Sequence, residues 1–460
     1  MKAARISKIL VANRGEIAVR VIRAAKELGK KTVAIYSDAD RDALHVKMAD
    51  ESVRIGPSPA KDSYLSMGGI ISAAKDFGAD AIHPGYGFLA ESAEFADTVQ
   101  SEGLIFIGPS AETIRSMGNK IKAREIIRAA GVPTVPGSAI SSDSVEDALD
   151  TADAIGYPVL IKAAAGGGGR GIRICNDRQD LQNQWKIARS EAYSSFGSNE
   201  TYVEKYIKNA KHIEVQILGD GVHQIHLLER DCSIQRKRQK VWEEAPAPIL
   251  PGDVRAAIHQ SAVDIARNIH YSGAGTIEYL FDTDENRFYF MEMNTRIQVE
   301  HGITEEITGI DIVKEMIKIA EGNELSITQQ DVASRGASIQ VRVIAEDPEN
   351  NLLPNIGKIS RMNWPSGPGV RVDHGLSVEY FVPPYYDGLL AKIIVHDASR
   401  IDALKRMARA LDETAIEGLK TNIKLLQALS IDDGIMAGEF NTNYFEDWLR
   451  DNGYLKKVRS

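Results

Sequence analysis

The chain has 460 residues, enough for about three domains, and its 43% apolar and 26% charged composition is typical of a globular protein. A net charge of −9 argues against nucleic acid or an anionic membrane as a partner, and no apolar run is long enough to span a bilayer. The two cysteines, Cys175 and Cys232, lack metal-ligand spacing, and the N-terminus leaves no room for a signal peptide. We therefore expect a cytoplasmic protein with no membrane or nucleic-acid partner.

The first hundred residues alternate strand and helix patterns. A buried strand is predicted for "KILVAN" and a helix for "GEIAVRVIRAAKELG", which ends at Gly29. The alternation continues through "KTVAIYS", "IISAAKDFG", "ADAIHPGYG", "EFADTVQSEG" and "LIFIGPS". This density predicts a parallel sheet with helices on both faces. The first turn, "ANRGEIA", lacks G-x-G-x-x-G, so we expect a Rossmann-like fold without its dinucleotide site.

A Pro/Gly/Ser-rich passage at residues 131–144 marks a boundary. Beyond it, "YPVLIKAAAGGGGRGIRIC" predicts a strand, a glycine loop and a strand, and a helix at about 178–196 and "TYVEKYI" complete a small lobe. From "HIEVQILGD" onward the chain is strand-rich, and we expect antiparallel pairing. After about residue 325, two further strands are predicted for "GASIQVRVIAED" and "LLAKIIVHD", and a helix for "RIDALKRMARALDE".

The stretch from Thr276 to His301 places two glutamates in apolar strands. If Thr276 pairs with Asn294, then Glu278 lies opposite Glu292, residues 283–287 form the loop, and the two Cβ atoms are roughly 5 Å apart. At an effective dielectric constant of about 20 the repulsion is about 3 kcal/mol, which a cation would have to offset. With the Asn294 amide oxygen, the carboxylates form an oxygen cluster that suits Mg²⁺ or Mn²⁺. In the alternative, which this pair alone leaves at even odds, one glutamate faces solvent.

The glycine loop from Ala165 to Gly171, "AGGGGRG", can present backbone N–H groups to phosphate oxygens. A flexible linker is the alternative, although linkers seldom join two short apolar strands within a compact lobe. Lys162 on the preceding strand would add a positive charge near the phosphates. The pattern G-x-x-x-x-G-K-[ST] is absent, which excludes a P-loop. Together with Lys120 and the acidic pair, the loop predicts a clamp that closes over ATP from two sides.

Nine stretches of the chain form a distinctive set: "ANRGEIAVRVIRAAKELG", "HPGYGFLAE", "FIGPSAETIRSMGNK", "GYPVLIKA", "GGGGRG", "ERDCSIQRKRQK", "EEAPAP", "EMNTRIQVEH" and "PPYYD". They give the chain, over essentially its whole length, a resemblance to the biotin carboxylases of the ATP-grasp superfamily. It implies α/β and α+β architecture, with an N-terminal Rossmann-like domain (1–118), an ATP-grasp domain (119–325) with a mobile lid lobe (about 132–206), and a C-terminal mixed α/β domain (326–460). It also implies that ATP converts bicarbonate to carboxyphosphate, which delivers CO₂ to the ureido nitrogen of biotin.

The resemblance assigns the nucleotide site residue by residue. The phosphates would be held by Lys120, Lys162, Gly168 and Gly169. The adenine hinge would be Glu204, Lys205, Tyr206 and Ile207, with His212 near the ribose and phosphates and Arg238 on the nucleotide side. Two Mg²⁺ or Mn²⁺ ions would be bound by Glu278, Glu292 and Asn294, in agreement with the hairpin hypothesis.

The same resemblance places the second substrate site beyond the hairpin. Arg296 and Lys240 would bind bicarbonate, with the Val299 backbone closing the pocket, and Glu300 would be the general base. Biotin would be held by Tyr86, Arg296 and Arg342, with Arg342 stabilising the enolate-like oxygen.

The chain departs from the family pattern at Arg238, where histidine is common, at Gly302, where proline is usual, and at Ala165, where glycine is common. Arg238 has a longer reach and a fixed charge, and Gly302 loosens its turn. We expect activity to survive with altered ATP affinity.

No biotin-accepting lysine in a Met-Lys-Met setting and no carboxyltransferase domain is found in the sequence. The resemblance therefore implies a subunit, expected as a homodimer, that acts on a separate biotin carboxyl carrier protein together with carboxyltransferase subunits. Acetyl-CoA carboxylase is the favoured setting, and split pyruvate, 2-oxoglutarate or other acyl-CoA carboxylases are alternatives. Two further classes stay open, a carbamoyl-phosphate-forming ligase and a non-catalytic nucleotide-binding regulator.

Overall fold

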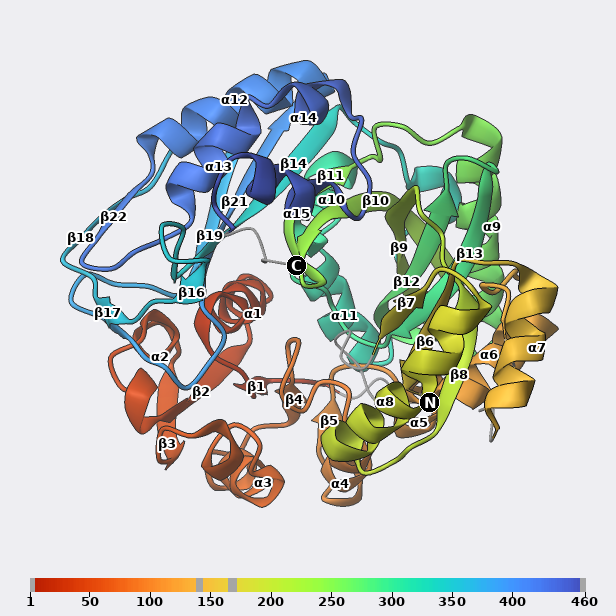
Figure 1. The fold of residues 1–460 in the computed structure, drawn as a ribbon. Helices are drawn as coiled ribbons and strands as arrows, with labels where there is room; N and C mark the ends of the chain where they lie inside the picture. Colours follow the sequence, from red (N-terminus) through yellow and green to blue (C-terminus); the bar gives the residue numbers. More distant parts are fainter. Residues whose placement is uncertain (1–4, 138–143, 164–171, 456–460) are drawn as a thin grey trace.

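The computed structural model describes residues 5–137, 144–163 and 172–455, and its ribbon forms three regions (Figure 1). An N-terminal region contains a parallel sheet, a small lobe projects from the body, and one large antiparallel sheet joins the middle of the chain to its C-terminal part. No helix among the described residues is long and apolar enough to cross a membrane.

The N-terminal sheet is parallel throughout, with the order β3-β2-β1-β4-β5. Its strands are β1 (Lys8–Val11), β2 (Lys31–Ser37), β3 (Glu51–Gly56), β4 (Ala81–His83) and β5 (Ile105–Phe106). Ile9 and Val11 pack against α1 (Gly15–Glu27), whereas Leu10 faces the core formed with α3 (Met67–Asp76) and α4 (Ala93–Ser101). Because successive side chains of a strand point to opposite faces, both faces of the sheet are covered, as predicted.

Two side chains fill the turn after β1, where the glycine-rich motif is missing. The Asn13 side-chain amide donates to the carbonyls of Pro84 and Tyr86, and the Arg14 guanidinium forms an ion pair with Asp40. Polar side chains therefore occupy this edge of the sheet, in agreement with the expected Rossmann-like fold without a dinucleotide motif.

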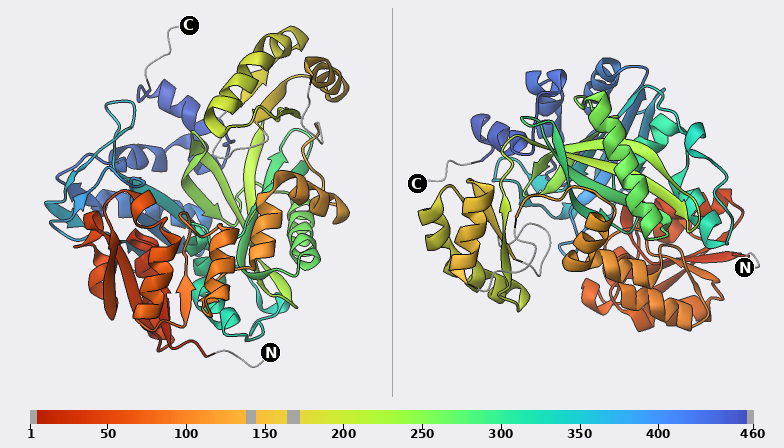
Figure 2. Two further views of the ribbon diagram at one scale, coloured as in Figure 1. Left: turned by 90° about the horizontal axis from the view of Figure 1, so that it is seen from below. Right: turned by 90° about the vertical axis from the view of Figure 1, so that its right-hand side faces the viewer.

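The small lobe has its own antiparallel sheet and its own core. The sheet has the order β7-β6-β8, and two helices pack against it. The elements are α7 (Val145–Ile155), β6 (Val159–Ala163), β7 (Arg173–Cys175), α8 (Arg178–Phe196) and β8 (Thr201–Lys205). The right-hand view of Figure 2 shows the lobe standing out from the rest of the molecule. The predicted strands and helix of this lobe are confirmed, and the glycine loop at 165–171 lies outside the described residues.

The large sheet has the order β13-β12-β9-β10-β11-β14-β21-β19 among the described residues, and all its pairs are antiparallel. The strands are β9 (Ala210–Asp220), β10 (Gln224–Arg236), β11 (Gln239–Ala245), β12 (Ser272–Asp282), β13 (Arg287–Asn294), β14 (Ala337–Ile344), β19 (Val370–His374) and β21 (Leu389–Asp397). β11 pairs with β14, where Trp242 lies opposite Val341, so one sheet crosses the domain boundary that the sequence places at residue 325.

Helices and short strands complete the fold. The helices are α2 (Leu44–Met48), α5 (Ala111–Gly118), α6 (Lys120–Ala129), α9 (Gly252–Asn268), α10 (His301–Thr308), α11 (Ile312–Ala320), α12 (Arg400–Glu413), α13 (Ile423–Ser430), α14 (Asp433–Ala437) and α15 (Tyr444–Asp451). The short strands are β15 (Glu346–Asp347), β16 (Leu353–Pro354), β17 (Gly357–Lys358), β18 (Arg361–Asn363), β20 (Phe381–Val382) and β22 (Ala415–Glu417).

The β12–β13 hairpin has the predicted pairing at its functional end. Thr276 lies opposite Asn294 and Glu278 lies opposite Glu292. A β-bulge then shifts the register by one residue, so that Asp282 pairs with Arg287. The loop is therefore 283–286, one residue shorter than the predicted 283–287.

Candidate functional site

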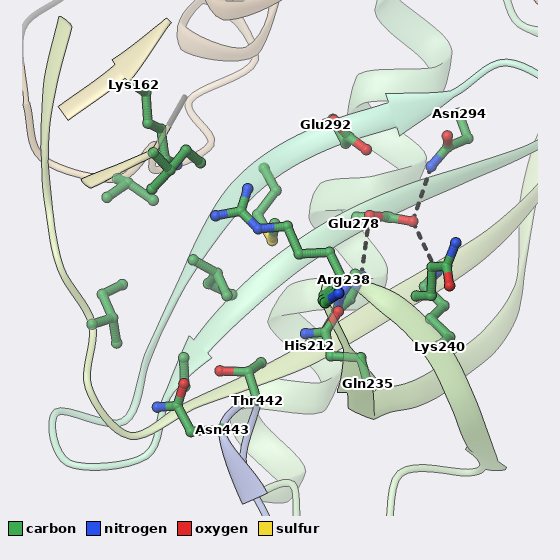
Figure 3. A pocket seen from close by; sticks show the side chains of 18 of the residues that line it. Lys162, His212, Gln235, Arg238, Lys240, Glu278, Glu292, Asn294, Thr442 and Asn443 are labelled. Atoms are coloured by element: carbon green, nitrogen blue, oxygen red, sulfur yellow. Dashed lines mark hydrogen bonds and ion pairs between the residues drawn. The ribbon is translucent and has the colours of Figure 1, made fainter. Parts of the chain in front are cut away.

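A cavity of about 740 Å³ lies between the large sheet, the lobe and the C-terminal segment. A second cavity of about 400 Å³ adjoins it on the lobe side. Most of the predicted site residues line the first cavity. Its wall includes Tyr86, Lys162, Lys205, Tyr206, Ile207, His212, Arg238, Lys240, Glu278, Glu292, Asn294, Arg296, Val299 and Arg342. Figure 3 shows Lys162 on the lobe across the cavity from Glu278 and Asn294 on the sheet.

Three glutamates form a row across neighbouring strands of the large sheet. Glu292 on β13 lies opposite Glu278 on β12, and Glu278 lies opposite Glu214 on β9. Cross-strand partners share a face, so the row adds a third acid to the predicted pair. Sequence analysis missed Glu214, although His212, Glu214 and Gln216 alternate with apolar residues in "HIEVQ".

Lys240 on β11 supplies the positive charge at the centre of this acidic row. Its Nζ lies 2.5 Å from Glu214 Oε2, 3.0 Å from Glu278 Oε1 and 2.6 Å from Glu300 Oε1. Burial opposes the charge of Lys240, but the three carboxylates outweigh it and raise its pKa well above the usual value. The cation that the acidic pair was predicted to need is therefore supplied for Glu278 by the protein itself, through Lys240 and His212.

Glu278 is held in its ionised form by several donors. His212 Nε2 lies 3.1 Å from Glu278 Oε2, and the side-chain amides of Asn294 and Gln298 donate to Oε1 at 3.0 and 3.2 Å. Burial raises the pKa of Glu278, but Lys240 and His212 outweigh burial and hold that pKa well below its usual range. The prediction placed the amide oxygen of Asn294 beside the carboxylates; in the structure that oxygen instead accepts from Arg296 at 3.0 Å.

Arg238 reaches the cavity from a tight turn between β10 and β11. Lys237 and Arg238 form this turn with φ values of 46° and 65°, the left-handed conformation of a two-residue hairpin. The Arg238 side chain lines both cavities, as do Lys162 and Glu292. Burial lowers the pKa of the Arg238 guanidinium, and the Glu292 carboxylate partly counteracts that effect. The departure from the family histidine therefore places a long cationic side chain beside the predicted nucleotide site.

The hinge and lobe residues meet at Glu204. Its carboxylate forms ion pairs with Lys162 and Arg124, and the main-chain N–H groups of Lys205 and Tyr206 donate to the carbonyls of Pro136 and Pro158. Glu204 therefore orients Lys162 of the lobe and Arg124 of α6, whereas residues 205–207 line the cavity. The predicted residues Gly168 and Gly169 and the side chain of Lys120 lie outside the part of the chain that the structure describes.

The C-terminal segment also reaches this end of the cavity, which the sequence analysis did not foresee. The Thr442 N–H donates to the Ala210 carbonyl at 2.9 Å, and the Asn443 side chain donates to the Lys208 carbonyl at 3.3 Å. Thr442 and Asn443 line the cavity beside the hinge (Figure 3). Their sequence separation of more than 200 residues from the hinge left no local signal for this contact.

Two arginines surround the opposite end of the cavity. Arg296 donates to Glu91 Oε2 at 2.8 Å and to Gln298 Oε1 at 2.9 Å. Arg342 donates to Glu243 Oε1 at 2.6 Å and to Glu300 Oε2 at 3.0 Å. Both guanidinium groups are held by carboxylates, so an anion entering here meets oriented donors.

Glu300 is fully buried behind Lys240 and Arg342, and it is not among the residues of the cavity wall. Burial raises its pKa, but Lys240, Arg342 and Arg230 outweigh burial and hold the pKa well below its usual value. As a base, Glu300 would therefore be weak until a substrate anion interacts with some of these three cations.

Tyr86 lines the cavity, and its hydroxyl donates to Glu16. Burial and the Glu16 carboxylate raise the Tyr86 pKa well above its usual value.

Together, a lobe that faces a carboxylate-bearing sheet and a cavity with cations at both ends indicate an ATP-dependent ligase. Comparison with known families agrees. Residues 119–328 match the model of the carbamoyl-phosphate synthase L chain, ATP binding domain, residues 5–114 match the biotin carboxylase N-terminal domain, and residues 340–447 match the biotin carboxylase C-terminal domain. The chain belongs to the biotin carboxylase family and is an ATP-dependent ligase.

Relatives from several enzymes resemble the chain over nearly its full length. Biotin carboxylase 1 of Bacillus subtilis (strain 168) is 51% identical over 96% of this chain and 99% of its own. The 2-oxoglutarate carboxylase small subunit of Hydrogenobacter thermophilus is 50% identical, covering 96% and 93%. The crystal structure of the biotin carboxylase domain dimer of that carboxylase, with MgADP, ADP and bicarbonate, superposes with a TM-score of 0.92 at 48% identity, covering 98% and 99%. A Campylobacter jejuni biotin carboxylase structure also gives 0.92, at 44% identity, covering 96% and 99%.

Proposed function

We propose that the chain carboxylates biotin carried on a separate carrier protein, using ATP and bicarbonate. A bicarbonate oxygen attacks the γ-phosphorus of ATP, ADP leaves, and the resulting carboxyphosphate breaks down to CO₂ and phosphate. The biotin ureido nitrogen, after losing its proton, then attacks CO₂. The observation that carries this proposal is the continuity of one cavity from the acidic row to the Arg296 and Arg342 end.

The nucleotide end of the proposal uses groups from both sides of the cavity. Lys162 on the lobe and His212 and Arg238 on the sheet supply positive charge for the phosphates, and residues 204–207 form the adenine hinge. Carboxylate oxygens of Glu278 and Glu292 face the same cavity, and this hard-oxygen donor set fits Mg²⁺ or Mn²⁺. When bound, the metal would neutralise phosphate charge; Glu278 and Glu292 would hold it together with Asn294, whose amide oxygen here accepts from Arg296.

The bicarbonate end requires an anion site beside a base. Lys240 and Arg296 border the cavity, and the Lys240 ammonium lies 2.6 Å from the Glu300 carboxylate. A bicarbonate held by Lys240 and Arg296 would share Lys240, one of the cations that depress the Glu300 pKa, so binding itself would make Glu300 a better base. Arg342, also in contact with Glu300, would stabilise the negative ureido oxygen of biotin beside Tyr86.

We also propose the holoenzyme in which this half-reaction takes place. We favour acetyl-CoA carboxylase and keep split pyruvate, 2-oxoglutarate or other acyl-CoA carboxylases as alternatives, because the relatives include a pyruvate carboxylase subunit and a 2-oxoglutarate carboxylase subunit as well as biotin carboxylases. We further propose a cytoplasmic homodimer that works with a biotin carboxyl carrier protein and carboxyltransferase subunits. We further propose that the chain divides into three domains after residues 118 and 325. The lobe at about 132–206 would close over bound ATP.

Steady-state ATP cleavage tests the function. We expect weak cleavage that requires bicarbonate and rises on addition of free biotin. ATP turnover that is indifferent to both bicarbonate and biotin would contradict the proposal, whereas ATP binding without any turnover would favour a non-catalytic nucleotide-binding regulator. Affinity capture of partner subunits, followed by assay of each acyl-CoA or keto acid, would identify the final acceptor.

A further inference from the structure

A buried lysine on β21 joins three separate parts of the chain. Lys392 has no exposed surface, and its Nζ lies 3.0 Å from Glu16 Oε2 on α1 and 2.9 Å from the carbonyl oxygen of Val299. Asp373 on β19 lies 3.6 Å away. A buried ammonium is strongly unfavourable unless it is paired and hydrogen-bonded, so this contact set defines one position for the side chain.

One end of this contact set lies directly before the proposed base. Val299 lines the cavity, and Glu300 follows it at the start of α10. The peptide group between them is planar, so a hydrogen bond to the Val299 carbonyl also fixes the direction of the Glu300 N–H and the position of its Cα. Lys392 therefore determines where the Glu300 backbone begins, without touching the cavity itself.

The other end reaches a second residue of the cavity wall. The second carboxylate oxygen of Glu16 accepts the Tyr86 hydroxyl, and Tyr86, like Val299, lines the cavity. Glu16 is only 5% exposed, so water offers little alternative to these two partners. A continuous buried path thus runs from Tyr86 through Glu16 and Lys392 to Val299.

We propose that Lys392 and Glu16 are positioning residues that hold Tyr86 and the Val299–Glu300 peptide at a fixed separation around the second substrate. This inference rests on the proposed function, because it assigns that end of the cavity to bicarbonate and biotin. The pair contacts none of the nucleotide-end groups Lys162, His212 or Glu278, so it acts on carboxyl transfer and leaves nucleotide binding unchanged.

The experiment compares Lys392→Met with a matched control, Lys211→Met. Lys211 is also buried, and its Nζ bonds Asp231 Oδ2 at 3.0 Å and the Gly438 carbonyl at 3.3 Å, on residues outside the cavity wall. We expect both variants to lose stability, but Lys392→Met alone to lower biotin-stimulated ATP cleavage, by about 10- to 100-fold as for a small misplacement of reacting groups. The ATP dissociation constant should stay within about twofold of wild type in Lys392→Met, because the nucleotide end is unchanged.

Glu16→Gln provides a milder second variant should Lys392→Met not fold. It keeps the shape and one hydrogen bond but removes the charge, and we expect the same selective loss in smaller measure. Combining Tyr86→Phe with Lys392→Met should change the rate less than the product of the single effects, because both interrupt one path. Wild-type protein without a biotin response would overturn the proposed function itself. If wild type, Glu16→Gln and any folded Lys392→Met all show a normal biotin response, only this inference is overturned. The inference is also overturned if Lys392→Met weakens ATP binding as much as it lowers biotin-stimulated ATP cleavage.

Discussion

Replacing Lys240 by methionine removes the cation shared by Glu214, Glu278 and Glu300. The three carboxylates lie within 2.5 to 3.0 Å of its Nζ, and Glu214 and Glu300 are fully buried. Arg230 remains in contact with Glu214 and Arg342 with Glu300, so the substitution leaves the acids partly compensated. The substitution therefore leaves an excess of negative charge on Glu214, Glu278 and Glu300 and measures what that excess costs in stability.

The expected loss is large because the ion pairs are buried. Unit charges about 4 Å apart attract by about 4 kcal/mol at an effective dielectric constant of 20, although desolvation offsets much of this. Removing one partner of a buried pair typically destabilises a protein by about 3–5 kcal/mol. We expect Lys240→Met to lose about this amount in free energy of unfolding at pH 7.

Urea unfolding of the metal-free and nucleotide-free protein measures this loss, with Lys420→Met as the matched control. Lys420 pairs with Glu349 on the surface, where both side chains are more than half exposed, and we expect Lys420→Met to change the free energy of unfolding much less than Lys240→Met. The Glu300 pKa is depressed in the fold, so its stabilisation is present above its unfolded value of about 4.3 and is lost as the pH falls toward the folded pKa. The difference between wild type and Lys240→Met should therefore shrink below about pH 4.5. A loss at pH 7 no greater than that of Lys420→Met would refute this account of the acidic row.

Further variants test individual roles. Glu300→Gln should retain ATP binding and lose bicarbonate-dependent cleavage, because the amide cannot accept the proton; lost nucleotide binding in equilibrium titration would contradict this. Arg238→Gln should raise the KM for ATP by about tenfold, the effect of losing one charge-assisted hydrogen bond, with little change in kcat; an unchanged KM would remove Arg238 from the nucleotide site. Small-angle scattering should show the lobe closing on addition of an ATP analogue, and identical profiles with and without it would contradict closure.

Local patterns predicted much of the fold and the paired acids. The alternation of "KILVAN" and its neighbours predicted the parallel sheet, and pairing Thr276 with Asn294 predicted that Glu278 lies opposite Glu292. Both predictions use residues close together in the chain, where the side-chain period restricts the possible arrangements.

Long-range features could not be predicted in this way. The β-bulge after Glu278, the joining of β11 to β14 and the approach of Lys240 to three acids depend on how distant strands pack. The burial of Glu300 depends likewise on Arg342, whose position in "IQVRVIAED" resembles an ordinary surface site. Glu214 was the exception, since its alternation with His212 was visible in the sequence.

Transfer of radiolabel from bicarbonate to free biotin, with ATP and Mg²⁺ present, tests the central claim most directly. We predict acid-labile label on biotin from the wild-type chain, dependent on ATP and absent with Glu300→Gln. ATP consumed without any label reaching biotin would contradict carboxylation as the function of this cavity.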